Sequence, residues 1–327
     1  AAAASAAISQ DEAEARATGK PGKTPHTKFA LNVEMWGMGM GFYDRIERAH
    51  ELGFPAVEFW PWRGKDLDHI AEIVEETGIE IAQFTGWGFN PGMNNPNNHA
   101  KFVEEVKASC VAAKKIGARK MTIVAGNNQK GMSQDEMLKG VTDGLKLAAP
   151  ICEDHNVMMI LEPMNGRRDH PGHCLYGSVD ATRICREVDS PMCKINWDLY
   201  HMQIEEGDLC GRMKDGFDQI GYLQFADHPG RNQPGTGEIH YNRVFREAIA
   251  LGYTDFVGAE CSPRSPQQRS SKVMSVCANS TAAPPRRSSS SSSPSDDAAC
   301  DGFFASASFV LRSSRLQLGF SGSARRL

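Results

Sequence analysis

Short apolar runs alternate along the chain with segments whose apolar residues recur at helical spacing, from about residue 28 to residue 260. Short continuous apolar runs are typical of strands buried on both faces, whereas three- and four-residue spacing is typical of amphipathic helices. A helical segment between successive strands implies that neighbouring strands are parallel. The apolar runs predict strands at residues 29–36, 56–60, 79–85, 120–125, 157–162, 193–198, 222–226 and 255–260.

Capping residues mark where two of the helices begin and end. Asp66 opens the helix predicted to run to residue 77, and Gly78 follows it, as expected of an N-cap and a left-handed C-cap. Ser133 and Glu136 have the spacing of a capping box at the start of a helix predicted to run to about residue 154. The other helices are predicted at residues 43–52, 99–116, 178–187, 208–220 and 241–250.

Eight strands joined by helices favour a closed α/β barrel, the (β/α)8 or TIM barrel. A doubly wound open sheet is the alternative. That fold would carry a glycine-rich phosphate turn after the first strand, and residues 37–41, Gly-Met-Gly-Met-Gly, lack the GxGxxG spacing. The eighth helix of the barrel is doubtful, because the sequence turns to serine, arginine and proline where that helix should follow.

The two ends of the chain differ in composition from this body. Residues 1–8 are small and apolar, and residues 9–27 are polar with several glycines and prolines. We expect residues 1–27 to be a disordered leader or the remnant of an export signal, so that an exported and a cytoplasmic location both stay open. Residues 265–327 are rich in serine and arginine. We expect a disordered or aberrant low-complexity tail there, and the barrel at residues 28–264.

Composition argues against several classes of partner. The 327 residues carry a formal net charge of -4, without the basic stripe of a nucleic-acid-binding protein. No run of about 18 apolar residues occurs, so we expect no membrane partner. The nine cysteines are scattered without CxxC pairs, which favours buried thiols over a disulfide framework or zinc site. A small neutral or anionic molecule is the expected partner, and a homo-oligomer stays open.

Polar side chains stand at the carboxyl ends of four consecutive predicted strands. Glu162, Asp198 and Glu260 end the fifth, sixth and eighth strands, and Gln224 lies in the seventh. Active sites of (β/α)8 barrels are built at this end, so the four side chains should converge. Polar residues occur at every barrel mouth, but convergent buried carboxylates need a counter-charge. The set therefore predicts a divalent cation, Mg2+ or Mn2+ rather than zinc, which would recruit His or Cys.

Two further side chains can reach the same mouth. His201 lies three residues after Asp198, and Arg231 follows the seventh strand. A histidine there can hydrogen-bond a substrate oxygen, and an arginine can hold a carboxylate or a pair of hydroxyls, although each also fits a surface role. His170 and His173 are weaker candidates that we expect to line the loop above the site.

Four motifs carry a resemblance to a known family: LEPMN at 161–165, WDLYHMQIEEGDL at 197–209, YLQFADHPGRNQPGTGEIHY at 222–241 and FVGAEC at 256–261. From about residue 28 to residue 264 the chain resembles the hydroxypyruvate isomerase family, within the xylose-isomerase-like TIM barrels. The resemblance implies a divalent metal held by Glu162, Asp198, Gln224 and Glu260.

The same resemblance implies roles for individual residues. Glu162 and Glu260 match the acid/base pair of the family, and His201 and Arg231 match positions that contact substrate. Gln224 stands where the related epimerases commonly have histidine, which favours the hydroxypyruvate isomerase branch. The family normally continues from the final glutamate into a closing helix, which residues 263–275 do not offer.

The implied reaction is isomerisation of a small α-hydroxy carbonyl compound through a cis-enediolate, as from hydroxypyruvate to tartronate semialdehyde. Ketose 3-epimerisation or sugar isomerisation on the same fold is the alternative. An endonuclease IV-like hydrolase is less favoured, because its multi-zinc site needs histidines from early strands and residues 85–88 and 125–127 supply none. A barrel that binds sugar or metal without turnover is the non-catalytic alternative.

Overall fold

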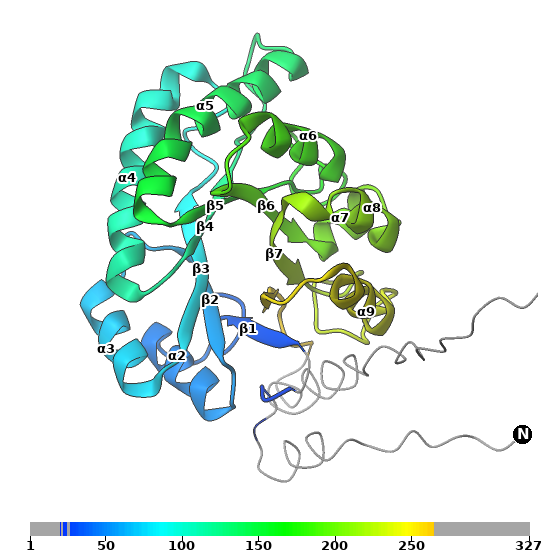
Figure 1. The fold of residues 1–327 in the computed structure, drawn as a ribbon. Coiled ribbons are helices and arrows are strands. Elements are labelled where there is room, and N and C mark those ends of the chain that lie inside the picture. The colour runs from blue at the N-terminus through cyan, green and yellow to red at the C-terminus, as the bar shows by residue number, and fades with distance from the viewer. Residues whose placement is uncertain (1–19, 21, 25–26, 265–327) are drawn as a thin grey trace, which may run out of the picture. The chain divides into compact units, whose positions relative to one another are not determined.

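The computed structural model of the protein describes residues 20, 22–24 and 27–264 (Figure 1). Most of the predicted leader at residues 1–27, and all of the predicted tail at residues 265–327, lie outside the described residues. The place where an eighth helix would follow the last strand also lies outside them.

Within residues 27–264, eight parallel strands form a closed barrel in which each strand pairs with the next and the last pairs with the first. This arrangement confirms the predicted TIM barrel. The strands are β1 (Lys28–Asn32), β2 (Ala56–Pro61), β3 (Glu80–Trp87), β4 (Lys120–Val124), β5 (Met158–Glu162), β6 (Cys193–Asp198), β7 (Ile220–Phe225) and β8 (Phe256–Ala259).

The connecting helices surround the strands on the outside of the barrel (Figure 1). The main core lies between the two, where the apolar faces of the helices pack on outward-facing strand residues. The helices are α2 (Phe42–Glu51), α3 (Leu67–Thr77), α4 (His99–Ile116), α5 (Gln134–His155), α6 (Ser178–Val188), α7 (Leu199–Glu205), α8 (Leu209–Asp215) and α9 (Tyr241–Leu251), with the 3-10 turns η1 (Pro96–Asn98) and η2 (Phe217–Gln219).

The predicted caps are present at both helices where capping residues stand out in the sequence. The Asp66 carboxylate accepts hydrogen bonds from the backbone N–H groups of Asp68 and His69, and α3 ends at Gly78 in the left-handed conformation. At α5, Ser133 and Glu136 form the predicted capping box. These side chains satisfy N–H groups that have no partner within the helix, which fixes where each helix begins.

Two predicted elements differ from the structure. The first strand ends at Asn32 rather than at residue 36, because the Asn32 side chain accepts hydrogen bonds from the backbone N–H groups of Glu34 and Met35 and turns the chain. The helix predicted at residues 208–220 is α8 followed by η2, and a further helix, α7, precedes it. α7 begins directly at the end of β6, so no loop separates strand and helix there.

The inner face of the barrel changes character within two residues along the strands. A separate buried cluster, here called the inner apolar layer, consists of Ala30, Ala56, Ala82, Ile160 and Tyr222. Because side chains alternate between the two faces of a strand, residues two positions further on face the same way. Four buried residues at those positions, here called the inner polar layer, are Asn32, Glu58, Glu162 and Gln224.

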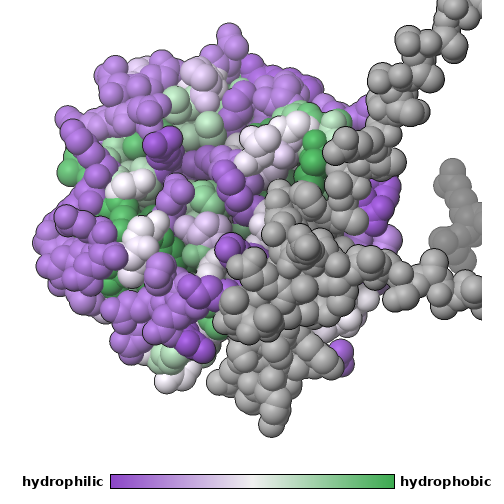
Figure 2. Space-filling view, turned by 60° about the horizontal axis from the view of Figure 1, so that its bottom comes forward, coloured by the Kyte–Doolittle hydropathy of each residue, from purple (hydrophilic) through white to green (hydrophobic). Residues whose placement is uncertain are grey.

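The visible surface of the barrel is mainly hydrophilic, with hydrophobic residues interspersed rather than gathered in one broad area (Figure 2). Among the described residues, no helix has the length and apolar character needed to cross a membrane. Most polar side chains lie on this surface, whereas the polar groups described next are buried inside the barrel mouth.

Candidate active site

Four predicted site residues lie at the carboxyl ends of four consecutive strands. Glu162 and Asp198 are the last residues of β5 and β6, Gln224 lies one residue before the end of β7, and Glu260 directly follows β8. The strand register sets Asp198 beside Gln224, and Gln224 beside Gly258. All four are buried, with exposed fractions of 7%, 0%, 1% and 5%. The barrel thus brings them to one end, as the sequence predicts.

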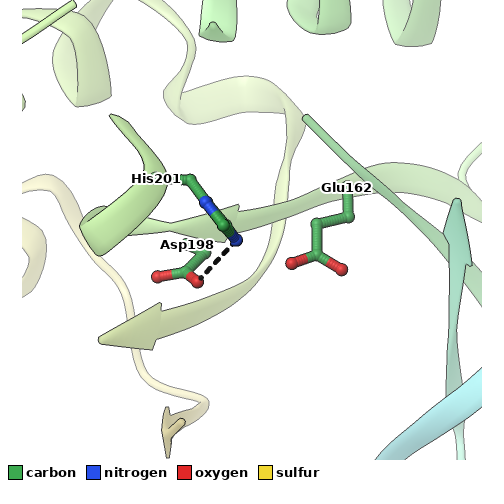
Figure 3. Close-up of side chains that lie close together, drawn as sticks. All are labelled: Glu162, Asp198 and His201. Carbon is green, nitrogen blue, oxygen red and sulfur yellow. Dashed lines mark ion pairs between the residues drawn. The ribbon is translucent and has the colours of Figure 1, made fainter. Parts of the chain in front are cut away.

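Glu162, Asp198 and His201 form the tightest group of potential ligands (Figure 3). One oxygen or nitrogen atom from each lies within 4.8 Å of those of the other two. Asp198 caps α7 by accepting a hydrogen bond from the backbone N–H of Tyr200 at 2.9 Å. Since α7 begins there, His201 lies on its first turn, and its Nε2 is 3.6 Å from Asp198 Oδ2.

Arg231 links Asp198 to Glu260. Its Nη2 donates to Asp198 Oδ2 at 3.0 Å and to Glu260 Oε2 at 2.5 Å. The second oxygen of Glu260 accepts a hydrogen bond from the indole N–H of Trp60 at 2.7 Å. The Arg231 guanidinium also lies over the ring of Tyr200, 4.9 Å from its centroid. Glu260 is therefore held on both oxygens, and Arg231 is fixed by two carboxylates and an aromatic face.

A buried carboxylate organises the loop that carries Arg231. Asp227 follows β7, and its Oδ2 accepts hydrogen bonds from the backbone N–H groups of Gly235, Thr236 and Gly237 at 2.7, 3.0 and 2.8 Å. Arg231 has a φ of 51°, in the left-handed region that is uncommon for residues other than glycine. Asp227 closes the loop around this conformation, so the sequence motif DHPGR contains both the functional side chain and its support.

Burial raises the pKa of two carboxylates at the mouth, Glu162 and Asp198. Burial is the largest cause for Glu162, whose pKa lies well above its ordinary value, and repulsion by Glu260 and Asp198 adds to it. Burial raises the pKa of Asp198 to about 7, although the Arg231 guanidinium opposes this shift. Burial lowers the pKa of Arg231, but the three carboxylates outweigh that effect and raise it. The positive charge of one guanidinium is thus shared among three buried carboxyl groups.

The donor set fits a hard divalent cation. The carboxylate oxygens of Glu162, Asp198 and Glu260 are the ligands that Mg2+ and Mn2+ prefer, and the amide oxygen of Gln224 belongs to the same class. A cation would supply the positive charge that three buried carboxylates and one arginine lack. The excess of buried negative charge is the feature of this structure that supports a metal site.

The histidine in the group is a hydrogen-bond donor rather than a ligand. Asn165 Oδ1 accepts from the backbone N–H groups of Arg168 and Asp169 at 3.1 and 2.9 Å, which turns the amide Nδ2 toward His201. That Nδ2 lies 2.6 Å from His201 Nδ1, so Nδ1 accepts and the ring proton resides on Nε2. Burial, and secondarily Arg231, lowers the His201 pKa well below its ordinary value. His201 is therefore neutral and presents an N–H to the site.

Gln224 is held by two buried neighbours. Its Oε1 accepts a hydrogen bond from Asn196 Nδ2 at 2.7 Å, and its Nε2 donates to Glu58 Oε1 at 2.8 Å. Asn32 Nδ2 donates to Glu58 at 3.0 Å and lies 3.4 Å from Glu260 Oε1. The structure thus joins Gln224 to the mouth through this network rather than by a direct bond to Glu162 or Asp198.

Glu58 is a residue of this site that the sequence analysis missed. It is fully buried in β2, and Tyr222 Oη donates to its second oxygen at 2.7 Å. Burial, followed by repulsion from Glu260, raises the Glu58 pKa to about 7. A signal was available, because Glu58 is the single charged residue in an apolar strand and buried acids are rare without partners.

A pocket of about 700 Å3 opens over these groups. Glu162, Glu260, His201 and Arg231 line it, together with aromatic side chains from the ends of β2 and β3. His170 also lines the pocket, as predicted for the loop above the site. His173 does not line the pocket; it is buried, with its ring 5.6 Å from that of Phe89.

The sequence matches the profile of a family described as "Xylose isomerase-like TIM barrel" over residues 46–277. The chain belongs to this family. The match covers most of the strands and all four site motifs, so it confirms the family resemblance that the motifs indicate.

Proteins with established names are similar to the chain over most of its length. Hydroxypyruvate isomerase of Escherichia coli (strain K12) is 28% identical over 253 residues, which cover 76% of this chain and 98% of that protein. The 2-oxo-tetronate isomerase of Cupriavidus necator is 30% identical over 245 residues, covering 73% of this chain and 94% of that protein. With relatives of this kind, the protein is an isomerase, as predicted.

Solved structures share the fold. An AP endonuclease of family 2 from Brucella melitensis has a TM-score of 0.70 at 24% identity, covering 75% of this chain and 96% of that one. The 3-keto-D-glucoside 4-epimerase of E. coli has a TM-score of 0.64 at 21% identity, covering 77% and 98%. At these identities the likeness concerns the barrel alone.

Proposed function

We propose that the protein is a metal-dependent isomerase of small α-hydroxy carbonyl compounds that acts through a cis-enediolate, in the manner of a hydroxypyruvate isomerase. The observation that supports this most directly is that two buried glutamates, Glu162 and Glu260, line one pocket together with His201 and Arg231. Proton transfer between adjacent carbons requires a general base and a general acid, which two carboxyl groups can supply, and a bound cation would stabilise the charge that develops.

Glu162 and Glu260 would move the proton. Burial raises the pKa of Glu162 above its ordinary value, which is the direction in which enzymes tune a carboxyl that acts as general acid and base. Glu260 is oriented by Trp60 and Arg231, one on each oxygen. In the proposed reaction one glutamate removes a proton from the hydroxyl-bearing carbon, and the other delivers a proton to the neighbouring carbonyl carbon. The hydroxyl proton passes to the former carbonyl oxygen, so the carbonyl group moves by one carbon.

Arg231 and His201 would orient the substrate. The Nε2–H of His201 faces the group formed with Glu162 and Asp198 and can donate to a substrate oxygen. The guanidinium of Arg231 has N–H groups in a planar fork, which suits a carboxylate or two neighbouring hydroxyls. Both side chains are held by neighbours, Asn165 for His201 and Glu260 for Arg231, so little freedom is lost on binding.

Glu162, Asp198, Gln224 and Glu260 would hold the cation, Mg2+ or Mn2+. When bound, such a cation stabilises the negative charge that develops on the substrate oxygens after proton removal. Gln224 would retain its bonds to Asn196 and Glu58, which fix the direction of its amide.

Hydroxypyruvate, converted to tartronate semialdehyde, is the substrate that the names of the E. coli and animal relatives suggest. The 2-oxo-tetronate isomerases suggest a four-carbon acid. Epimerisation of a ketose is the second candidate, because the same acid/base pair would serve it by returning the proton to the opposite face of the same carbon. The pocket of about 700 Å3 has room for a sugar.

The test is a panel of α-hydroxy carbonyl compounds incubated with the protein in D2O with Mg2+ or Mn2+, followed by proton NMR. An isomerase incorporates deuterium at the carbon that carried the carbonyl and forms the isomeric product. An epimerase incorporates it at the original carbon with inversion. Absence of exchange from every compound, with binding retained, would support the non-catalytic barrel, and several zinc ions per chain in metal analysis would support the hydrolase.

A further inference from the structure

The pocket is much larger than the reacting unit that the proposed isomerase needs. Its volume is about 700 Å3. A three-carbon acid occupies a small part of such a space, and pockets of roughly 300–1,000 Å3 commonly enclose most of a drug-sized ligand. The excess space lies within one continuous pocket that includes Glu162 and Glu260, so it belongs to the same binding event.

A wall of tryptophans leads away from the acid/base pair. Trp60, at the end of β2, is 38% exposed, and its indole N–H is bonded to Glu260 at 2.7 Å. Two residues further on, Trp62 donates its indole N–H to Ser109 Oγ at 2.8 Å. Both indoles line the pocket, and both are fixed through their nitrogen atoms. Fixed aromatic faces bind the apolar C–H face of a sugar ring with little loss of side-chain entropy.

A planar ion pair closes the wall at its outer part. The Arg63 guanidinium lies over the ring of Trp62, 4.2 Å from its centroid. Arg63 is also bonded to both oxygens of Glu105 on α4, at 2.9 and 2.8 Å. Both residues line the pocket. The pair offers N–H donors and carboxylate acceptors side by side, which is the combination that neighbouring sugar hydroxyls require.

The Arg63–Glu105 pair favours a neutral group over an anion. Arg63 and Glu105 neutralise each other, and Glu105 would repel a phosphate or carboxylate placed against the pair. Lys101, one helical turn before Glu105, lines the same part of the pocket and has no ion pair among the described residues. A single exposed lysine is a weak site for an anion, because water and salt screen its charge.

We infer that the substrate of the proposed isomerase is a glycoside, in which the α-hydroxy carbonyl unit is linked to a second, uncharged sugar ring. The reacting unit lies at Glu162 and Glu260. The second ring stacks on Trp60 and shares hydrogen bonds with Glu105 and with Arg63, which Trp62 holds in place from below its guanidinium plane. This substrate class rests on the proposed function, because the position of the reacting unit follows from it.

The test compares two matched substrates: a disaccharide in which one ring carries a ketone beside a free secondary hydroxyl, and the keto-monosaccharide made of that ring alone. α-Proton exchange in D2O gives kcat/KM for each. The disaccharide should be preferred by at least roughly tenfold, and Arg63→Ala and Trp62→Ala should each lower that preference by roughly tenfold. Arg186→Ala, which removes an exposed bidentate pair with Asp218 elsewhere on the barrel, is the matched control.

Equal kcat/KM for the two substrates, or preference for a phosphorylated monosaccharide, would overturn the glycoside inference while leaving the isomerase intact. Absence of exchange from every compound would instead refute the proposed isomerase. In that case calorimetric binding of the non-oxidised disaccharide and monosaccharide still decides the subsite: tighter disaccharide binding that Arg63→Ala abolishes supports it, and equal binding overturns it. Thermal unfolding of each variant shows that the comparison is made on folded protein.

Discussion

The two inner layers of the barrel lie two residues apart along the strands, and one is apolar whereas the other is polar. The inner apolar layer contains three alanines, Ile160 and the ring of Tyr222, and it forms a cluster separate from the main core. The inner polar layer contains Glu58 and Glu162, whose pKa values burial raises. Apolar burial stabilises the fold, whereas buried carboxylates with raised pKa values cost folding free energy when they are charged.

This contrast separates the residues that stabilise the barrel from the residues of the candidate active site. Small side chains at Ala30, Ala56 and Ala82 let the strands close around Tyr222, whose hydroxyl then donates to Glu58. One side chain of the apolar layer, Tyr222, is thus hydrogen-bonded to the polar layer and supports it. Stability and function conflict in the polar layer alone, as is common at active sites, and the predictions below test this separation.

The largest expected effect comes from removing the acid/base groups. Glu162→Gln and Glu260→Gln should each lower metal-dependent α-proton exchange by roughly 10²- to 10⁴-fold, because an amide cannot transfer the proton. The Tm of the metal-free protein should not fall for Glu162→Gln. Burial disfavours the charged form of Glu162 and raises its pKa, and a neutral amide carries no charge to bury. Glu47→Gln, an exposed change on α2, is the control. Near-normal kcat in either variant would show that the acid/base assignment is wrong.

Loss of a metal ligand should be large but partly reversible. Asp198→Ala should abolish exchange at low metal concentration, and excess Mn2+ should restore part of it. Cation binding at 100 times its Kd stabilises a fold by about 2.7 kcal/mol, so Mn2+ should raise the Tm of the unaltered protein and not that of Asp198→Ala at the same concentration.

The control for Asp198→Ala must account for its second role as the cap of α7. Asp66→Ala removes the corresponding cap of α3 without touching the mouth, and it should cost about 1 kcal/mol of unfolding free energy. Asp66→Ala should keep the full Mn2+ response. An identical Mn2+ response in both variants would remove Asp198 from the metal site.

The pH dependence of the metal-free protein should expose the cost of the polar layer. Glu58 has a pKa raised from 4.5 to about 7, so between these values the folded state binds more protons than the unfolded state. Stability therefore decreases as pH rises through this window, by up to ~1.4 kcal/mol per pH unit for one such group. Glu58→Gln should flatten the decrease in unfolding free energy measured from pH 4.5 to 7, and Glu47→Gln should leave it unchanged. A slope unaffected by Glu58→Gln would mean that other carboxyls carry the dependence.

The sequence predicted the acids of the site better than their neighbours. Glu162, Asp198 and Glu260 follow apolar strands, and parallel strands place their carboxyl ends together whatever the details of packing. The bonds of Gln224 to Glu58 and Asn196 depend on strand register and amide orientation, which periodicity does not encode. The sequence analysis missed α7 because this helix begins directly after Asp198, the last residue of β6. No turn residues separate the strand from the helix, and such residues are the usual sign that a new element begins.

A smaller effect is expected from reversing the tautomer of His201. Asn165→Asp replaces the amide donor by a carboxylate, so His201 Nδ1 would carry the proton and Nε2 would lose the N–H that faces the site. Loss of one hydrogen bond to substrate should lower kcat/KM roughly tenfold. Asn165→Ala, which leaves both tautomers open, should have a smaller effect, and nitrogen NMR of the His201 ring reports the tautomer directly. Equal kcat/KM in all three proteins would rule out a donor role for Nε2–H.

The smallest expected effect on activity comes from the inner apolar layer. Ile160 is fully buried in β5, two residues before Glu162 on the same face. Ile160→Val removes one methylene and should lower the free energy of unfolding by about 0.5–1.5 kcal/mol. Because the change leaves the charges and hydrogen bonds of the mouth intact, α-proton exchange should stay within about twofold. Denaturant unfolding and exchange kinetics measure the two quantities on one preparation. If exchange fell in proportion to stability, the two layers would act as one unit, and the division between support and chemistry would not hold in this barrel.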